Sequence, residues 1–467
     1  MKKEVKCIPS LQVSEKELKH QARNTSIKEG IFASIRTSFG DHYISPFAIA
    51  LNASDSLVAL LGSFTGLFGA LSQSYGAKLM EKHSRKKILL NLILLESLIW
   101  FPMIILAWLF TQNILTNFLP IFLIFLFTIY TIMSNMGNPA FFSWLGDLIS
   151  TKKRGRWFAK RNLIIGFTSV ILAILASFML DYMKSKNMTM TGFSILFFLA
   201  FLGRLASWKT FQKQYEPTLC LKKGYYFSFK DFIKNAHKTN FGKFAIYRFF
   251  FSFVCAISSP LLAVYLLRHL GFSYSTYMII TFAGTFFSLI ILGFWGKFAD
   301  KYGNYKTIYI SCIGILILPF LWVLNKSPTY LILIPALING TAWAGFHLSE
   351  KNFTYDNVSK PKRGLALSYY NILWGTGTFL GAALGALLIK IIKIPSIETI
   401  IFIFILGGIL RFLVVIIGIP KIKEIRPILE FKSSDAINII TKQAKPTLLE
   451  ELHQIISIKE YFHHNKK

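Results

Sequence analysis

One apolar stretch in the second half of the sequence carries side chains that can exchange protons. Its polar and aromatic members recur at i, i+4, i+8 and i+11 and are Asn339, Trp343, His347 and Glu350. In a helix this spacing places all four along one face. Imidazole titrates near neutral pH, and a carboxyl group in a dry site can hold a proton there. The stripe predicts a cavity wall able to relay protons; hydrogen bonding between helices is the alternative for His347.

A second polar stripe lies close to the N-terminus. Its members follow i, i+3, i+4 spacing and are Ser34, Thr37, Ser38, Asp41 and Ser45. Asp41 falls near the middle of an otherwise apolar stretch, where an unpaired carboxylate is unfavourable, so we expect it to face water or a cation and to protonate as its surroundings dry. Arg36 is a candidate partner, although a separation of five residues puts it on another face of a regular helix. The alternative for Asp41 is a structural cap or kink beside Gly40.

Two further residues complete the predicted cavity set. They are Asn138 and Arg248, each inside an apolar stretch. Either can contact a substrate, or take part in a helix bend together with the nearby Pro139 and Pro260. Three other charged residues in apolar stretches are expected to form structural pairs and are Glu96, Arg204 and Arg411.

The elements that must position these residues follow from composition. The chain has 467 residues, of which 53% are hydrophobic and 16% are charged. This is too apolar for a soluble surface, and it suits twelve membrane helices of about 20 residues each. The four cysteines have no metal-ligand spacing, so we expect no disulfide, metal or cofactor. The phosphate-binding pattern GxxxxGK[ST] is absent from the sequence, which argues against ATP hydrolysis.

The predicted fold is all-α and integral to the membrane, with two pseudo-symmetric bundles of six transmembrane helices. The first six spans are 30–51, 55–77, 88–110, 118–142, 160–182 and 193–212. The second six are 244–267, 274–296, 307–324, 329–350, 365–389 and 397–419. The predicted domains are a cytoplasmic segment 1–29, bundles 30–212 and 244–419, a cytoplasmic linker 213–243 and a cytoplasmic tail 420–467. Aromatic residues of the linker predict either a helix on the membrane surface or a plain connection, and are Tyr225, Tyr226, Phe227, Phe229 and Phe232.

The net charge of +30 is unevenly distributed across the predicted membrane. Of the 52 Lys and Arg residues, 42 fall in the termini and in loops on one side, and six fall on the other. This asymmetry predicts that both termini are cytoplasmic in a multi-pass protein of the cell membrane. Anionic lipid head groups are a sufficient partner for the charge, and without a nucleic-acid-reading motif we expect no nucleic acid partner.

Two loop motifs recur at matching places in the halves. After the second span the chain reads AKLMEKHSRKK, and after the eighth it reads GKFADKYGNYK. The residues singled out there are Glu81, Lys82 and Arg85, then Gly296, Asp300, Lys301 and Gly303. The second pair of motifs consists of Asp147, Arg154 and Gly155, and of Asp356, Arg363 and Gly364. Both resemble cytoplasmic loop motifs of the major facilitator superfamily, although the first copy replaces two glycines by Ala77 and Ser84 and the aspartate by Glu81.

The resemblance implies a substrate path between the halves, lined mainly by the first, fourth, seventh and tenth spans. It also implies that the loop residues are latches, holding the cytoplasmic side shut when the cavity faces outward. The alternative is that they are solvated loops of the positive-inside pattern. Three glycines of the eleventh span, Gly377, Gly381 and Gly385, predict a close helix contact.

These patterns together predict a monomeric secondary active transporter that moves a small solute by alternating access. Protons are the favoured drive because Asp41, His347 and Glu350 can all change protonation. A uniporter is one alternative, and a non-transporting sensor or scaffold with residues 420–467 as its output is another. The sequence has no convergent catalytic set, so we do not expect an enzyme.

Overall fold

Helices account for all regular structure in the part of the chain that the structure describes. The computed structural model describes residues 15–149, 154–217, 228–359, 362–392 and 398–426. Predictions for 1–14, for linker residues 218–227 and for tail residues 427–467 fall outside this part, as do the surroundings of Arg154 and Gly155. The all-α fold class is confirmed. Eleven described segments are long and apolar enough to cross a membrane, and the protein is a multi-pass membrane protein.

The first half forms one bundle. Its elements are α1 (Glu15–Phe39), η1 (Asp41–Tyr43), α2 (Ile44–Ala50), α3 (Asp55–Leu79), α4 (Arg85–Leu98), α5 (Trp100–Thr111), α6 (Leu119–Leu148), α7 (Arg154–Ser185) and α8 (Thr189–Gln212). Serine side chains begin two of these helices, because Ser54 and Ser84 accept the backbone N–H groups of Leu57 and Lys87.

The second half repeats the plan after a short helix, α9 (Phe229–Ala236). Its elements are α10 (Asn240–Ser258), η2 (Ser259–Leu261), α11 (Leu262–Val264), η3 (Tyr265–His269), α12 (Tyr274–Tyr302), α13 (Asn304–Leu324), α14 (Pro328–Leu333), α15 (Pro335–Asn357), α16 (Arg363–Ile391), α17 (Thr399–Gly418) and η5 (Ile419–Lys421). Part of the linker is therefore helical in α9, whose buried Phe232 packs on the protein with its ring centroid 5.7 Å from that of Tyr369; its position relative to the membrane surface stays a prediction.

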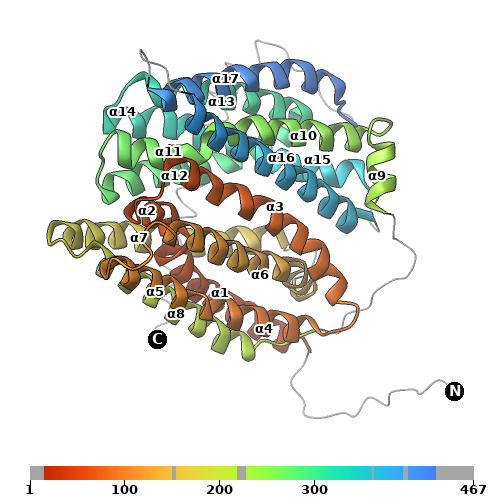
Figure 1. Cartoon of the computed structure of the whole chain (residues 1–467). Coiled ribbons are helices and arrows are strands. Elements are labelled where there is room, and N and C mark those ends of the chain that lie inside the picture. The colour runs from red at the N-terminus through yellow and green to blue at the C-terminus, as the bar shows by residue number, and fades with distance from the viewer. Residues whose placement is uncertain (1–14, 150–153, 218–227, 360–361, 393–397, 427–467) are drawn as a thin grey trace.

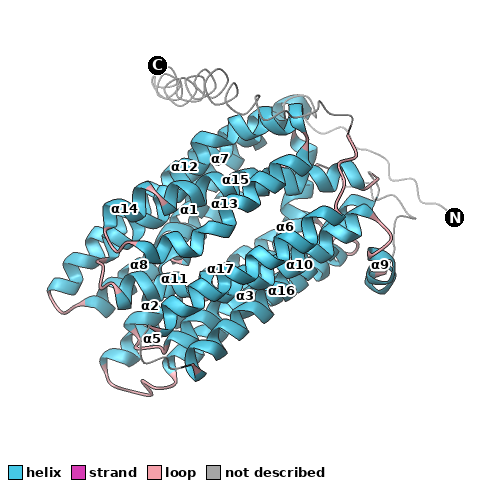
Figure 2. Ribbon diagram, turned by 90° about the horizontal axis from the view of Figure 1, so that it is seen from above, coloured by secondary structure: helices cyan, strands magenta, loops and turns pink. Residues whose placement is uncertain are grey.

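The bundles lie side by side, as Figure 1 shows with α1 to α8 in red to yellow-green and α10 to α17 in green to blue. The largest contact between them joins α3 to α16, which also run next to each other in the view of Figure 2, and α7 meets α12. The predicted glycine contact is present, because a Cβ on Gly377, Gly381 or Gly385 of α16 would overlap a backbone carbonyl of α10. Small residues therefore set how closely α16 approaches α10.

The first predicted span, 30–51, differs from a continuous apolar helix. It is built from the C-terminal half of α1, then η1 and α2, and the regular helix ends at Phe39. Gly40 adopts φ −107° and ψ −78°, and a Cβ there would overlap the Trp100 ring. The close approach of Trp100 therefore requires glycine at the break, and the break changes which polar residues can meet.

Candidate functional site

The break after α1 joins two residues that sequence spacing separates. Nη2 of Arg36 lies 3.3 Å from Oδ2 of Asp41, so Arg36 is a partner of Asp41, although the spacing of five residues would separate them on a regular helix. The cause is the tight turn of η1, which turns Asp41 back toward the end of α1. The hydroxyl group of Tyr130, on α6, donates to Oδ1 of Asp41 at 2.6 Å and accepts a hydrogen bond from Arg36.

Arg36 also begins a line of alternating charges that crosses four helices. Nη1 of Arg36 lies 3.5 Å from Oε2 of Glu96 on α4, and Nη2 of Arg204 on α8 lies 2.7 Å from the same oxygen. Arg204 lies 4.0 Å from Glu29 on α1, and Glu29 lies 3.4 Å from Arg161 on α7. We call this set the charge chain; its members are Asp41, Arg36, Glu96, Arg204, Glu29 and Arg161.

The charge chain is electrically balanced, and four of its six members are buried. The exposed fractions of the whole residues are 2% for Glu96, 4% for Glu29, 8% for Arg161 and 9% for Arg204. Three guanidinium groups face three carboxylates, so no net formal charge is buried, as burial in a low-dielectric interior requires. Within the described residues, the Nε atoms of Arg36 and Arg204 are buried without a hydrogen-bond partner.

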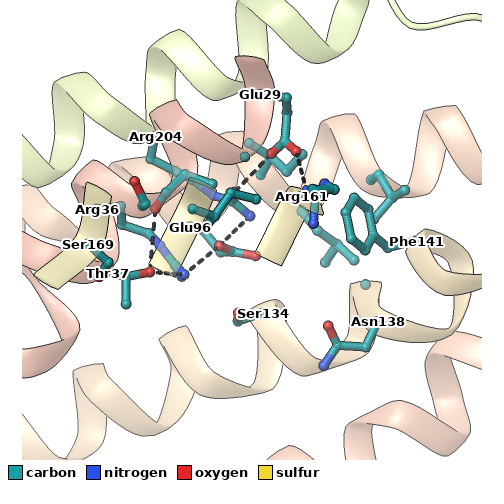
Figure 3. A pocket seen from close by; sticks show the side chains of 18 of the residues that line it. Glu29, Arg36, Thr37, Glu96, Ser134, Asn138, Phe141, Arg161, Ser169 and Arg204 are labelled. Carbon is teal, nitrogen blue, oxygen red and sulfur yellow. Dashed lines mark hydrogen bonds and ion pairs between the residues drawn. The ribbon is translucent and has the colours of Figure 1, made fainter. Parts of the chain in front are cut away.

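A cavity of about 290 Å³ opens onto the charge chain. Figure 3 shows Glu29, Arg36, Glu96, Arg161 and Arg204 gathered on one wall, with Ser134 and Asn138 of α6 opposite. Ser34, Thr37 and Ser169 add hydroxyl groups to the lining, and Phe141 adds an aromatic face. The predicted cavity residues Arg36 and Asn138 therefore line the same space.

A second cavity, of about 430 Å³, lies between the two halves. Asp41 and Tyr130 line it from the first half, and Trp374 and Thr378 of α16 line it from the second. Asp41 thus contacts the space between the halves while its partner Arg36 lines the first cavity. The walls are also joined by hydrogen bonds, because Asn371 of α16 donates to Gln73 of α3 at 3.0 Å and Gln73 donates to Asn135 at 3.1 Å.

The second half contains a smaller polar cluster. Nε of Arg248 lies 3.7 Å and Nδ1 of His347 lies 3.3 Å from Oε2 of Glu350. Trp343 stacks on His347 with ring centroids 5.1 Å apart. Arg248 is buried, whereas the His347 side chain is 51% exposed. The structure brings together four predicted residues here, while Asn339 lies against Gly284 of α12.

The loop residues of the first half form pairs within that half. Nη1 of Arg85 lies 2.6 Å from Asp147, and Nε lies 3.8 Å from Glu216, which follows α8. Arg85 also donates to the carbonyl group of Pro217 at 2.6 Å. Glu81 and Lys82 are exposed and take no part in these pairs. Sequence reasoning did not identify Glu216 as a partner, because nothing in the spacing links it to the motif.

The matching loops of the second half behave in the same way. Asp356 lies 2.8 Å from Arg426, which follows α17 and also lies 3.8 Å from Asp300. Asn304 donates to Asp356 at 2.8 Å. The other predicted residues here lie in or beside the same helix ends. Gly296 and Lys301 are in α12, and Gly303, with φ +93°, lies between α12 and α13. Gly364 is the second residue of α16. Arg363 donates to the carbonyl groups of Val358 and Tyr355.

At the opposite end of the molecule, charged residues join the two halves directly. Arg268 of η3 donates to the carboxylate of Asp55 at the start of α3, and to the carbonyl group of Ala53 at 2.7 Å. His269 lies 3.5 Å from Asp55. Asp181 of α7 accepts the first two N–H groups of α12, from Tyr274 and Ser275, at 2.8 and 2.9 Å. Sequence reasoning did not predict these contacts, because their partners are far apart in the chain.

Comparison with known proteins gives one family and several similar folds. The family model described as Major Facilitator Superfamily matches residues 31–238 and 244–462. No curated protein matches the sequence. The crystal structure of nucleoside transporter NupG is similar with a TM-score of 0.61 at 13% identity, covering 86% of this chain and 98% of that one.

Two other similar structures come from bacterial homologues of transporters. One is an inward-facing bacterial homologue of the iron transporter ferroportin, with TM-score 0.62 at 14% identity, covering 86% of this chain and 99% of that one. The other is an inward-facing bacterial homologue of the human lysosomal transporter Spinster, with TM-score 0.59 at 13% identity, covering 88% and 100%. At these identities the likeness is one of fold.

Proposed function

Because the chain belongs to the Major Facilitator Superfamily and is a membrane transporter, we propose that it moves a small solute across the cell membrane by alternating access, driven by protons. The observation that carries this proposal is the charge chain, which connects a cavity between the halves to a second cavity within the first half. Ionic groups at membrane depth are unfavourable unless they are paired or face water, and such groups commonly mark a path for a substrate or ion.

Alternating access requires one end of the molecule to be tied while the other is open. The pairs of Asp55 with Arg268 and of Asp181 with the α12 N-terminus join the halves at one end. At the other end the ion pairs of Arg85 and Arg426 lie within single halves. With the termini assigned to the cytoplasm, this arrangement supports a state whose cavity opens inward. The loop residues would act as latches in the other state, in which the cavity faces outward and they hold the cytoplasmic side shut.

Asp41 is the proposed coupling group. Its side chain is 26% exposed, it lines the cavity between the halves, and it pairs with Arg36. Protonation would remove the charge that holds Arg36, leaving Glu96 as the remaining carboxylate partner of this arginine. Protonation of Asp41 would thereby change, through Arg36, the cavity of about 290 Å³ that Arg36 lines. In the second half, Glu350 and His347 form another titratable pair, and Glu350 also contacts Arg248 of the same half.

The balance of three cations against three carboxylates supports a polar solute without net charge, either neutral or zwitterionic. Such a solute can replace hydrogen bonds of the charge chain without bringing an uncompensated charge into a dry cavity.

The proposal is tested by uptake of radiolabelled polar solutes into proteoliposomes, with and without an imposed pH gradient. We expect at least one solute to accumulate faster with the gradient, and Asp41→Asn to abolish the gradient's effect while downhill exchange continues. Unchanged gradient-driven uptake by Asp41→Asn would remove this residue from coupling. If no solute in a broad panel moved or bound, the transport proposal itself would fail, in favour of a non-transporting membrane protein.

A further inference from the structure

A groove on the outer surface of the second half has no part in the proposed transport path. It lies between the first turns of α10 and the last turns of α17 and has a volume of about 650 Å³. Its lining consists of His237, Lys243, Ile246, Tyr247, Phe250, Val414, Ile417, Gly418, Pro420, Lys421 and Lys423. The volume falls within the range of sites that hold small molecules, about 300–1,000 Å³.

The groove is divided into a basic end and an apolar end. The basic end consists of His237, Lys243, Lys421 and Lys423, all of them exposed at or just beyond the helix ends. The apolar wall runs from there along the two helices and consists of Ile246, Phe250, Val414 and Ile417. Gly418 deepens the groove, since a Cβ there would overlap the ring of the buried Tyr247.

In the described part of the chain, no acidic side chain forms an ion pair with the basic residues of the groove. The two nearest acids in sequence are engaged elsewhere: Glu424 accepts the N–H group of Tyr305 at 2.9 Å, and Asp231 accepts the hydroxyl of Ser228 at 2.5 Å. The first turn of α10 adds the positive end of a helix dipole beside Lys243.

The position of the groove relative to the bilayer follows from its two helices. Asn240–His269 and Thr399–Lys421 are both segments able to span a membrane, and the basic residues lie at or beyond their ends. Basic residues at span ends reach the level of lipid head groups. Phe250 is 50% and Ile417 is 59% exposed, so the apolar wall faces the hydrocarbon.

The opposite flank of α17 provides an internal comparison. A groove of about 680 Å³ lies there against α13, and its lining contains no Lys, Arg or His residue. Both flanks are apolar, but cations gather on one alone. The basic residues are therefore a feature of the groove between α10 and α17 and not of every apolar groove on this bundle.

We propose that the groove between α10 and α17 binds one anionic phospholipid from the adjoining leaflet. Lys243, Lys421 and Lys423 donate to the phosphate group, and His237 adds a fourth contact. One acyl chain lies along Ile246, Phe250 and Ile417. Tight binding requires both the anionic head group and the acyl chain of the lipid, because the groove is basic at one end and apolar along the rest.

Native mass spectrometry of the full-length protein in detergent tests this site. The probes are phosphatidylglycerol, phosphatidylcholine of the same chain length, and glycerophosphoglycerol, which is the anionic head group without chains. We expect one tightly bound phosphatidylglycerol, with an affinity at least about tenfold above that of the other two probes, because each basic residue near an anionic surface contributes to the attraction.

Two variants, each lacking three lysine charges, distinguish binding of the lipid at this groove from general electrostatic attraction of the lipid to the protein. The site variant is Lys243→Gln, Lys421→Gln and Lys423→Gln; the matched control is Lys78→Gln, Lys87→Gln and Lys213→Gln, three exposed lysines on the first half. Phosphatidylglycerol should bind the site variant about tenfold more weakly and the control within about twofold of the parent. Single substitutions Lys243→Gln and Lys421→Gln serve if the triple variant unfolds.

Three outcomes would overturn the proposal. The first is equal loss of phosphatidylglycerol binding in both triple variants, which would leave only diffuse attraction. The second is equal affinity for phosphatidylcholine. The third is equal affinity for the head group without chains, which would indicate a phosphate site rather than a lipid groove. None of these measurements depends on transport, so they are independent of the proposed function.

Discussion

At the scale of single residues, Glu96 is the point where two arginines of the charge chain converge. Its side chain is 3% exposed, with Arg36 at 3.5 Å and Arg204 at 2.7 Å. Removing one partner of a buried ionic group leaves an uncompensated charge and costs about 3–5 kcal/mol. We therefore expect Glu96→Gln to lower the thermal unfolding midpoint in detergent substantially.

The control for this variant is Glu81→Gln, because Glu81 is an exposed carboxylate. Its effect on the free energy of unfolding should stay within about 0.5 kcal/mol, as for most surface substitutions. Equal midpoints for the two variants would mean that Glu96 is not held as an ion in the folded protein.

Arg36 depends on its shape as well as its charge. Its guanidinium contacts Asp41, Glu96 and the Tyr130 hydroxyl group together, and a lysine ammonium cannot present the same planar set of donors. We expect Arg36→Lys to keep the fold, since the positive charge remains, and to reduce gradient-driven uptake at least about tenfold, a factor that equals 1.4 kcal/mol. Uptake at the parent rate, with an unchanged unfolding midpoint, would show that charge alone suffices.

At the scale of helices, the contact between α10 and α16 depends on glycine. A Cβ on Gly381 would overlap the carbonyl oxygen of Phe253, whereas nothing lies within 4 Å of the Cβ position of Gly146 in α6. Overpacking a tight contact costs about 1–3 kcal/mol, and alanine in place of an unconstrained helical glycine gains about 0.4–1 kcal/mol. Gly381→Ala should lower the unfolding midpoint and Gly146→Ala should raise it; a rise for both would contradict the packing account.

Some features of the helices and of the candidate site were predictable from the sequence, and others were not. Helix spans were predictable because lipid imposes both a length and an apolar composition. The equal positions of Asp147 and Asp356 in the two halves identified these carboxylates as motif residues, but nothing in the sequence identified Arg426 as the partner of Asp356. Arg36 was a candidate partner of Asp41, but the geometry that joins them was not predictable, because it depends on the helix break at Gly40, where the Trp100 ring packs too closely for any side chain. Glu29 was assigned to the polar segment 1–29 and Arg161 lies at the very start of the span 160–182, yet both are buried in helices that extend beyond the apolar stretches.

At the scale of the whole molecule, the contacts between halves determine which end is closed. Asp55 and Arg268 are 24% and 33% exposed, so their pair contributes about 1 kcal/mol at most. An energy of that size changes the ratio of two conformers about fivefold. We expect Asp55→Asn to shift the population toward the state that is open at this end.

The shift can be measured with a cysteine in place of Phe282, whose ring meets His42 of the first half at 4.9 Å across the interface. A membrane-impermeant maleimide added from the α3 N-terminal side should label this cysteine about fivefold faster in Asp55→Asn, in proportion to the open population. Glu398→Gln is the matched control, because Glu398 contacts His269 within the second half; its labelling rate should equal that of the parent. Exchanging the charges, with Asp55→Arg and Arg268→Asp together, should restore slow labelling, since the pair is re-formed with opposite polarity. Fast labelling in the exchanged protein would mean that the two halves are held at this end by contacts other than this ion pair.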